Sequence, residues 1–434
     1  MKLWIAEHSR LDFFSGMSSK SLSLLCFAIL MQFSNHLVPS TCAKDRPFEG
    51  DDYATNACDA LISHSEPGDP MLDESWFNCD RPKQNFIRVK PVYYGEVFSN
   101  TRGGITTKDA TRYLGLLDLG FEWNFGEDQT AVPAKFYFLA QNTHGQGITT
   151  DFVGDSQVVS NIDSFDNIMQ VSEYWAEFES NCGALTLRLG KQDINTEFLF
   201  INQAEDFIQS TFGLSPSPAF STFPAPSMAA VAMLQLNENW CFKTGLWDAF
   251  ASGGGWGFSG NDSFVLISEL EYTYALADGR LPGILAFGAA YESEGVIDDA
   301  PVSSVSEYIL QLEQLVYREV QSDDDAIQGL GLFVGYYPRS LGSKIIPEST
   351  GDSFVAGAVY TGLLPDRDQD VLGVGLAWAE LFQGGTNEET VVELFYKAQL
   401  TPRVRAQPDF QFVKSPSGIY RDALVAGFRF QVDF

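Results

Sequence analysis

The sequence predicts an all-β protein, a transmembrane antiparallel β-barrel of about 16 strands. Three observations predict this fold. Apolar and polar residues alternate over positions 423–434, and the chain stops on the aromatic residue Phe434. Amphipathic segments of the same kind recur from residue 86 onward, separated by turn residues. The connections between these segments alternate between short and long.

The C-terminal segment has the clearest alternation. One face of a strand over 423–434 would carry Leu424, Ala426, Phe428, Phe430, Val432 and Phe434. The other face would carry Ala423, Val425, Gly427, Arg429, Gln431 and Asp433. A period of two lets one face contact lipid while the other contacts water. We therefore expect the closing strand of an outer-membrane barrel, recognised through Phe434 by the barrel assembly machinery. The alternative is an edge strand of a soluble sheet.

The order of the segments favours a membrane barrel over a soluble sheet. The expected strands begin near residues 86, 111, 133, 171, 183, 228, 240, 263, 282, 305, 328, 353, 370, 388, 408 and 421. If the first strand enters from the periplasm, short connections such as 126–132 and 277–281 all fall on that side. The long connections 142–170 and 192–227 fall on the outer side, which is the asymmetry of outer-membrane barrels, although the later outer connection 381–388 is short.

Composition agrees with this fold and excludes some partners. The 434 residues include 35 Phe and 16 Tyr, and the mean hydropathy is −0.07. Beyond residue 43 no apolar run reaches the roughly 18 residues of a transmembrane helix. The formal net charge is −30, which disfavours nucleic acid as a partner because nucleic acid requires basic surfaces. The acidic surplus fits wet loops at a lipopolysaccharide surface, and simple solubility is the alternative.

The chain divides into three expected parts. Residues 1–43 have the apolar core and small-residue cleavage site of a signal peptide, whose true start could be Met17. Residues 44–85 are polar and acidic, and we expect a periplasmic or plug-like segment. Residues 86–434 are expected to form the transmembrane barrel.

Four cysteines remain after the expected cleavage: Cys58, Cys79, Cys182 and Cys241. An even number in an exported protein suggests disulfides. Cys182 and Cys241 both fall near expected periplasmic turns, so a disulfide between them or to a neighbouring protein is one hypothesis, and free thiols are the alternative. No C-x-x-C spacing occurs, and we expect no metal and no cofactor.

Several motifs in order resemble one family of channels. Residues 187–198 read L-R-L-G-K-Q-D-I-N-T-E-F, 212–216 read F-G-L-S-P, 331–336 read G-L-F-V-G-Y and 365–370 read P-D-R-D-Q-D. Together they resemble the carbohydrate-selective porins of the OprB family. The resemblance covers about residues 86–434, whereas the W-G-G-x-R segment that the family often carries before its first strand is missing. The resemblance implies an outer-membrane porin of sixteen strands that passes glucose-like sugars.

Strand alternation identifies candidate residues of the channel lining. These are Trp175, Glu177, Glu179 and Arg188 on neighbouring strands, and Lys191, Asp193 and Asn195 where the chain enters its longest loop. Charged and amide groups can bond sugar hydroxyls, and an aromatic face can contact the sugar ring. The alternatives are that Glu177 and Arg188 form only a neutralising ion pair, and that Asp193 and Asn195 only shape the loop. The loop 192–227 is rich in proline and is expected to fold into the barrel rather than to cap it from outside.

Other functions remain as alternatives. A general non-selective porin would need no sugar site, and a structural barrel protein, disulfide-linked to the envelope, would need no channel. A serine hydrolase would need His64 or His144, but no G-x-S-x-G motif accompanies either, so we expect no enzyme. Expected partners are neutral sugars, outer-membrane lipid and lipopolysaccharide, and a homo-oligomer is left open.

Overall fold

The structure is a computed structural model that describes residues 86–125, 134–180, 183–216, 220–249, 255–259, 263–297, 300–319, 327–341, 350–382 and 388–434. The expected signal peptide 1–43 and the polar segment 44–85 lie outside these residues. Among the described residues, no helix is long and apolar enough to cross a bilayer.

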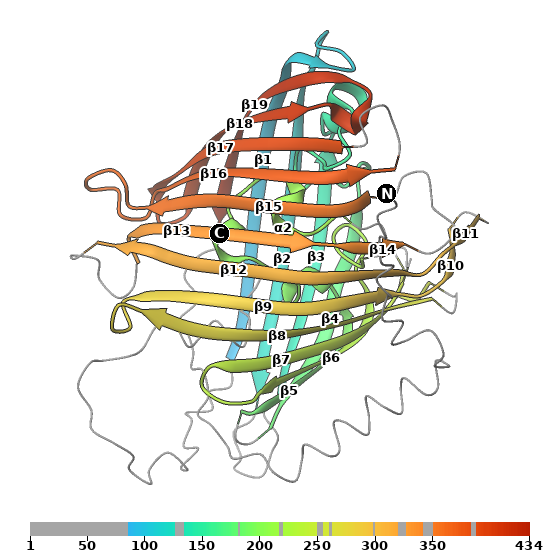
Figure 1. The fold of residues 1–434 in the computed structure, drawn as a ribbon, viewed down its shortest axis with the longest axis vertical. Helices are drawn as coiled ribbons and strands as arrows, with labels where there is room; N and C mark the ends of the chain where they lie inside the picture. Colours follow the sequence, from blue (N-terminus) through green and yellow to red (C-terminus); the bar gives the residue numbers. More distant parts are fainter. Residues whose placement is uncertain are drawn as a thin grey trace, which may run out of the picture. The chain divides into compact units, whose positions relative to one another are not determined.

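Antiparallel strands form a closed wall, shown in Figure 1. Each strand of the wall pairs with the wall strands before and after it in the chain, and the last strand pairs with the first, from Val92↔Asp433 to Gly104↔Arg421. The strands are β1 (Phe86–Gly104), β2 (Thr111–Phe125), β3 (Ala134–Gly145), β4 (Met169–Glu179), β5 (Leu185–Gln192), β6 (Ser227–Gln235), β7 (Trp240–Asp248), β8 (Phe264–Leu276), β9 (Leu281–Glu292), β10 (Gly295–Ile297), β11 (Ala300–Val302), β12 (Val305–Arg318), β13 (Gly329–Tyr337), β14 (Arg339–Leu341), β15 (Thr350–Thr361), β16 (Val371–Leu381), β17 (Glu388–Thr401), β18 (Val404–Lys414) and β19 (Arg421–Asp433).

The described part of the chain forms a barrel of 16 strands, so the predicted fold class is confirmed. The sheet contains 17 segments because β13 and β14 both pair with β12 and together make one strand of the wall. Pro338 separates them, and proline lacks the N–H that would continue the ladder. The hairpin of β10 and β11 stands outside this sheet.

The observed strands begin within a few residues of the predicted positions, and β18 differs most. It begins at Val404 rather than near Pro408. Proline is tolerated within a sheet at the first residue of a strand or where the ladder is interrupted. In the structure the register between β17 and β18 runs from Phe395↔Asp409 to Ala398↔Ala406 and skips Pro408, so the proline lies inside the strand where that ladder is interrupted.

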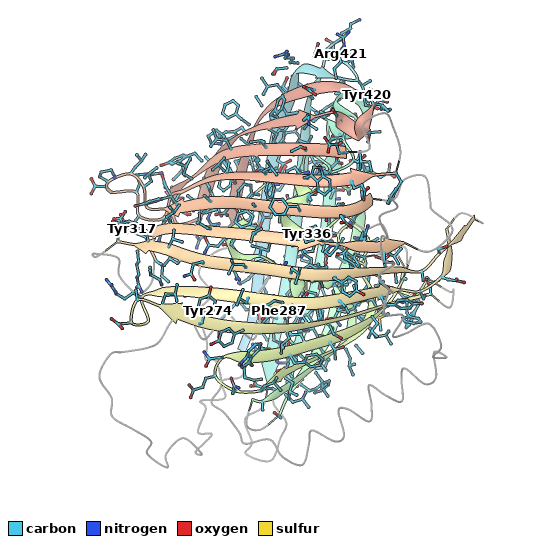
Figure 2. All side chains as sticks on the ribbon, viewed as in Figure 1. Tyr274, Phe287, Tyr317, Tyr336, Tyr420 and Arg421 are labelled. Atoms are coloured by element: carbon cyan, nitrogen blue, oxygen red, sulfur yellow. The ribbon has the colours of Figure 1, made fainter. Side chains whose placement is uncertain are left out.

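The outer wall is apolar and aromatic, as a lipid-facing surface requires. Figure 2 labels Tyr274 and Tyr317 towards one end of the strands and Phe287 and Tyr336 further along the wall. Phe287 and Tyr317 are 45% and 50% exposed. On β19 the predicted alternation holds, because Leu424 and Phe428 are exposed while Val425 and Arg429 are buried inside.

Short helices occupy the two long connections: η3 (Thr149–Val153) between β3 and β4, and η4 (Ile194–Thr196), η5 (Asn202–Ala204) and α2 (Ser210–Gly213) between β5 and β6. A further short helix, η6 (Pro416–Gly418), joins β18 to β19. His144 is the one histidine among the described residues. Its side chain lies on the outer surface of the wall, where its Nε2 is 2.9 Å from the Tyr93 hydroxyl.

Cys241 is disulfide-bonded. Cys182 lies outside the described residues, but the adjoining chain is close, since Gln235 pairs with Cys241 and its N–H donates to the carbonyl of Ala184 at 2.9 Å. We propose Cys182 as the partner. Peptide mapping by mass spectrometry without reduction is expected to find the two peptides linked, and to find them separate after reduction. Alkylation of both thiols before any reduction would contradict the assignment.

Candidate functional site

The long connection 193–226, called the inserted loop below, folds into the barrel. Its Phe207 and Phe212 stack with ring centres 4.2 Å apart, and Phe207 makes edge contacts with Phe333 of β13 and Phe395 of β17. A Cβ on Gly375 would lie 2.5 Å from the Phe212 ring, so the wall needs glycine there. Figure 1 shows α2 inside the ring of strands. The expectation that this loop folds inward is confirmed.

Glutamates that point inward from the wall hold the inserted loop by its backbone. Backbone N–H groups buried in a loop need acceptors, and a carboxylate is a strong one. The N–H of Leu199 donates to Glu269 (2.7 Å), that of Gln203 to Glu313 (2.8 Å), and those of Ile208 and Gln209 to Glu393 (2.7 and 3.0 Å). Part of the acidic surplus therefore lies inside the barrel, where it positions the loop.

The inserted loop buries much of the inner wall but leaves some inward side chains open to water. Inward side chains in the same buried cluster as the loop, such as Ile267 and Val355, are fully buried. On β3 and β4 the inward side chains of Lys135, Tyr137 and Glu177 remain partly exposed. Water therefore reaches the inner wall near the start of β3 and the end of β4, whereas inward residues further along these strands, such as Leu139 and Glu173, are buried.

Arg188 of β5 lies at the centre of a largely buried cluster beside these side chains. Nε and Nη2 of Arg188 donate to Glu177 Oε2 at 2.9 and 2.7 Å, and Nη2 lies 2.8 Å from Glu197 Oε1. The guanidinium carbon lies 4.2 Å from the Trp175 ring centre, and Trp175 stacks on Tyr137 at 5.0 Å. We call these five residues the arginine cluster. Its carboxylates and its aromatic face hold the guanidinium in one orientation.

Strand register explains how the cluster forms. Alternation along β4 turns Trp175, Glu177 and Glu179 inward, as predicted, and Glu177 stands directly opposite Arg188 on β5. The neutralising ion pair considered as an alternative is therefore present. Glu179 lies nearer the end of β4, opposite Thr186, and remains half-buried.

Asp193 and Asn195 fasten the inserted loop where it leaves β5. Asp193 accepts hydrogen bonds from the backbone N–H groups of Asn195 at 2.8 Å and Phe223 at 2.7 Å. The Asn195 amide donates to the carbonyl of Gly213 at 2.8 Å. Burial raises the pKa of the Asp193 carboxyl above its ordinary value, and the bonds from Asn195 and Phe223 oppose that shift. These polar atoms are engaged in shaping the loop.

Lys191 is not brought to the arginine cluster. It pairs with Tyr174 on β4 and Met228 on β6, at positions with the opposite parity to Arg188. Its ammonium donates to the carbonyls of Val171 at 2.8 Å and Gly255 at 3.3 Å. Lys191 therefore lies on the outer side of the wall, beneath a segment of the connection between β7 and β8.

Two members of the cluster were missed from the sequence. Tyr137 could have been found, because alternation on β3 turns it inward with Lys135. Glu197 lies in the irregular inserted loop, where no periodicity indicates direction. Burial raises the pKa of Glu197, and Arg188 opposes that shift.

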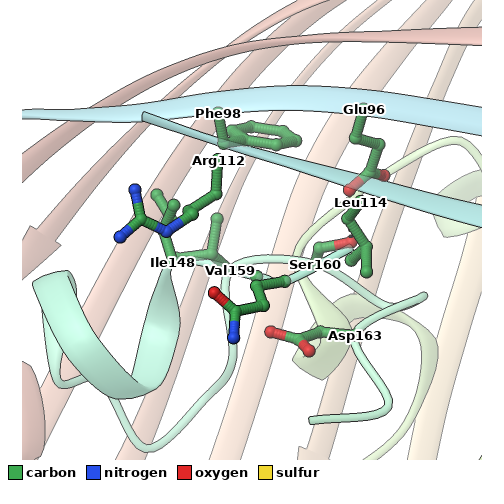
Figure 3. A pocket seen from close by; sticks show the side chains of 10 residues that line it. Glu96, Phe98, Arg112, Leu114, Ile148, Val159, Ser160 and Asp163 are labelled. Atoms are coloured by element: carbon green, nitrogen blue, oxygen red, sulfur yellow. Dashed lines mark hydrogen bonds between the residues drawn. The ribbon is translucent and has the colours of Figure 1, made fainter. Parts of the chain in front are cut away.

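A second inward arginine, Arg429 of β19, has similar surroundings. Its Nε donates to Glu96 at 2.5 Å, its Nη2 donates to Asn161 at 2.5 Å, and the guanidinium lies 5.8 Å from the Tyr94 ring centre. Figure 3 shows the cavity beside Glu96, which is also lined by Ser160. The cavity measures about 10 Å³. It has room for about one water molecule and none for a sugar.

Comparisons with known proteins agree with this architecture. The family model described as "Carbohydrate-selective porin, OprB family" matches residues 108–434. Porin B of Pseudomonas aeruginosa is 22% identical over 405 residues, covering 80% of this chain and 87% of that protein. The high-pH structure of Pseudomonas putida OprB superimposes with a TM-score of 0.70 at 20% identity, covering 80% of this chain and 94% of that chain.

The family model spans well over half of the chain, and the solved structure shares its fold. The barrel and its apolar outer wall are those of a protein of the Gram-negative outer membrane. The chain therefore belongs to the carbohydrate-selective porins of the OprB family.

Proposed function

We propose that this porin lets small neutral sugars of the glucose type diffuse through the barrel along the wall that carries the arginine cluster. The arginine cluster is the observation that carries the proposal. Tyr137, which is partly exposed and stacks on Trp175, offers an aromatic face to the C–H side of a sugar ring, and Glu177, held by Arg188, can bond hydroxyls. Glu179 would continue this lining along β4.

Paired charges favour a neutral solute over an ion. The Arg188 guanidinium is shared by two carboxylates, and Arg405 of β18 lies 2.7 Å from Asp433. The charges of such a pair largely cancel locally while its donors and acceptors stay fixed, so a sugar gains hydrogen bonds there while an ion gains little.

Uptake by liposomes that carry the refolded protein tests this function. Glucose is expected to enter faster than gluconate, a charged solute of similar size. Trp175→Ala removes the ring on which Tyr137 stacks and is expected to lower glucose entry about fivefold, since an aromatic contact contributes roughly 1 kcal/mol. Trp378→Ala, on the outward-facing side of β16, is the matched control and should leave the rate unchanged.

Two other uptake results would favour the alternative functions. Equal entry of glucose and gluconate, unaffected by Trp175→Ala, would identify a general non-selective porin. Absence of any uptake by correctly folded protein would favour a structural barrel.

A further inference from the structure

The connection between β7 and β8 lies against the outside of the barrel. Its described residues, 255–259, contact Tyr174, Lys191 and Met228, which pair with one another at outward positions of β4, β5 and β6. Trp256 packs edge-on against Tyr174 with ring centres 6.2 Å apart. The segment thus lies flat against the outer wall near the extracellular ends of β5 and β6.

Hydrogen bonds fix this segment to the wall. The Tyr174 hydroxyl donates to the carbonyl of Trp256 at 2.7 Å. The backbone N–H of Met228 donates to the carbonyl of Gly257 at 2.8 Å. The N–H of Ser259 donates to Asp248 at 3.1 Å. Gly257 has φ +82°, and a Cβ there would lie 3.0 Å from both Lys191 and the Met228 nitrogen. The close approach therefore depends on glycine.

Lys191 connects the segment to the strands beneath it. Its side chain is fully buried, although it projects from the outward face where lipid would otherwise lie. A cation in that position needs polar partners. The carbonyls of Val171 and Gly255 supply them, so the segment covers the cation and the cation fastens the segment.

The segment presents large apolar side chains away from the barrel. Trp256 is 80% exposed and Phe258 is 65% exposed. Leu189 and Leu246, on the neighbouring outward wall, are also exposed. The apolar surface of the segment is therefore continuous with the wall that faces lipid, at the end of the strands where outer-membrane barrels carry aromatic residues.

We propose that residues 255–259 form an interfacial anchor that inserts Trp256 and Phe258 into the acyl-chain boundary of the outer leaflet. Lys191 is the residue that positions this anchor. The proposal concerns the lipid contact of the barrel and does not rest on sugar transport. A glycine-rich connection would thus bind the membrane surface rather than the channel mouth.

Fluorescence quenching in vesicles tests the anchor. The full chain is refolded into phosphatidylcholine vesicles brominated either near the head group or near the chain ends, and the Trp256 signal is the difference between wild type and Trp256→Phe. Head-group bromine is expected to remove most of this difference signal, chain-end bromine much less, and aqueous acrylamide little. Trp175→Phe serves as the interior control, whose difference signal neither bromine position should quench.

Two further variants keep the test independent of that one side chain. Lys191→Met and Gly257→Val should both make the Trp256 signal accessible to acrylamide while heat-modifiable gel migration shows a folded barrel. Strong acrylamide quenching in wild type would overturn the anchor, because the segment would lie in water. Protection from bromine and acrylamide alike would also overturn it, since a protein partner such as a second copy would then cover Trp256.

Discussion

Replacing Arg188 with alanine is expected to lower glucose entry and to make the channel more cation-selective. The arginine neutralises Glu177 and Glu197 and lies on the face of Trp175. Without it, two inward carboxylates lose their counter-charge, and the inner wall becomes more negative. Because the guanidinium is buried, the folded barrel should also lose about 3–5 kcal/mol of stability, the usual cost of removing one partner of a buried ion pair.

Glucose uptake by liposomes measures the loss of sugar entry, and reversal potentials under a salt gradient in planar bilayers measure the gain in cation selectivity. A triple variant, Arg188→Met with Glu177→Gln and Glu197→Gln, removes all three charges together and separates charge from sugar contact. It should restore the reversal potential towards wild type while glucose entry stays low. Normal glucose entry in both variants would show that the cluster has only a structural role and takes no part in sugar passage.

The outline of the barrel could be predicted because each strand carries its own signal. A period of two places Val425 and Arg429 inside and Leu424 and Phe428 outside regardless of the rest of the chain. The same period predicted that Trp175, Glu177 and Arg188 face inward from neighbouring strands. Lys191 obeys it as well, because a residue three positions after an inward arginine points outward; its prediction as a lining residue assumed that the strand had already ended.

The contacts of the inserted loop could not be predicted, because they join distant parts of the chain. Alternation turns Glu393 inward, but its partners Ile208 and Gln209 lie 185 and 184 residues away. The contact of Glu197 could not be predicted either, since an irregular loop has no period that fixes the direction of a side chain. The acidic surplus was assigned to wet loops, whereas several of these glutamates bind buried backbone N–H groups.

Replacing Glu393 with alanine is expected to release the inserted loop from the wall and to raise single-channel conductance. The carboxylate accepts two buried N–H groups beside the stacked Phe207 and Phe212. Each N–H left without an acceptor costs about 1–3 kcal/mol, which is enough to favour a detached loop with solvated backbone. Because the loop occupies the interior, its displacement should widen the path for ions as well as sugars.

Conductance in planar bilayers, together with limited proteolysis within 193–226, measures this release. Glu393→Gln should have a smaller effect, since the amide oxygen still accepts from the backbone and the amide group can donate to Asp409, which lies beside it. Glu388→Ala is the matched control, because that glutamate lies on the same strand but is exposed and bonds Lys414. If Glu393→Ala keeps wild-type conductance and protease resistance, the aromatic stack alone holds the loop. The inward glutamates would then solvate its backbone without positioning it.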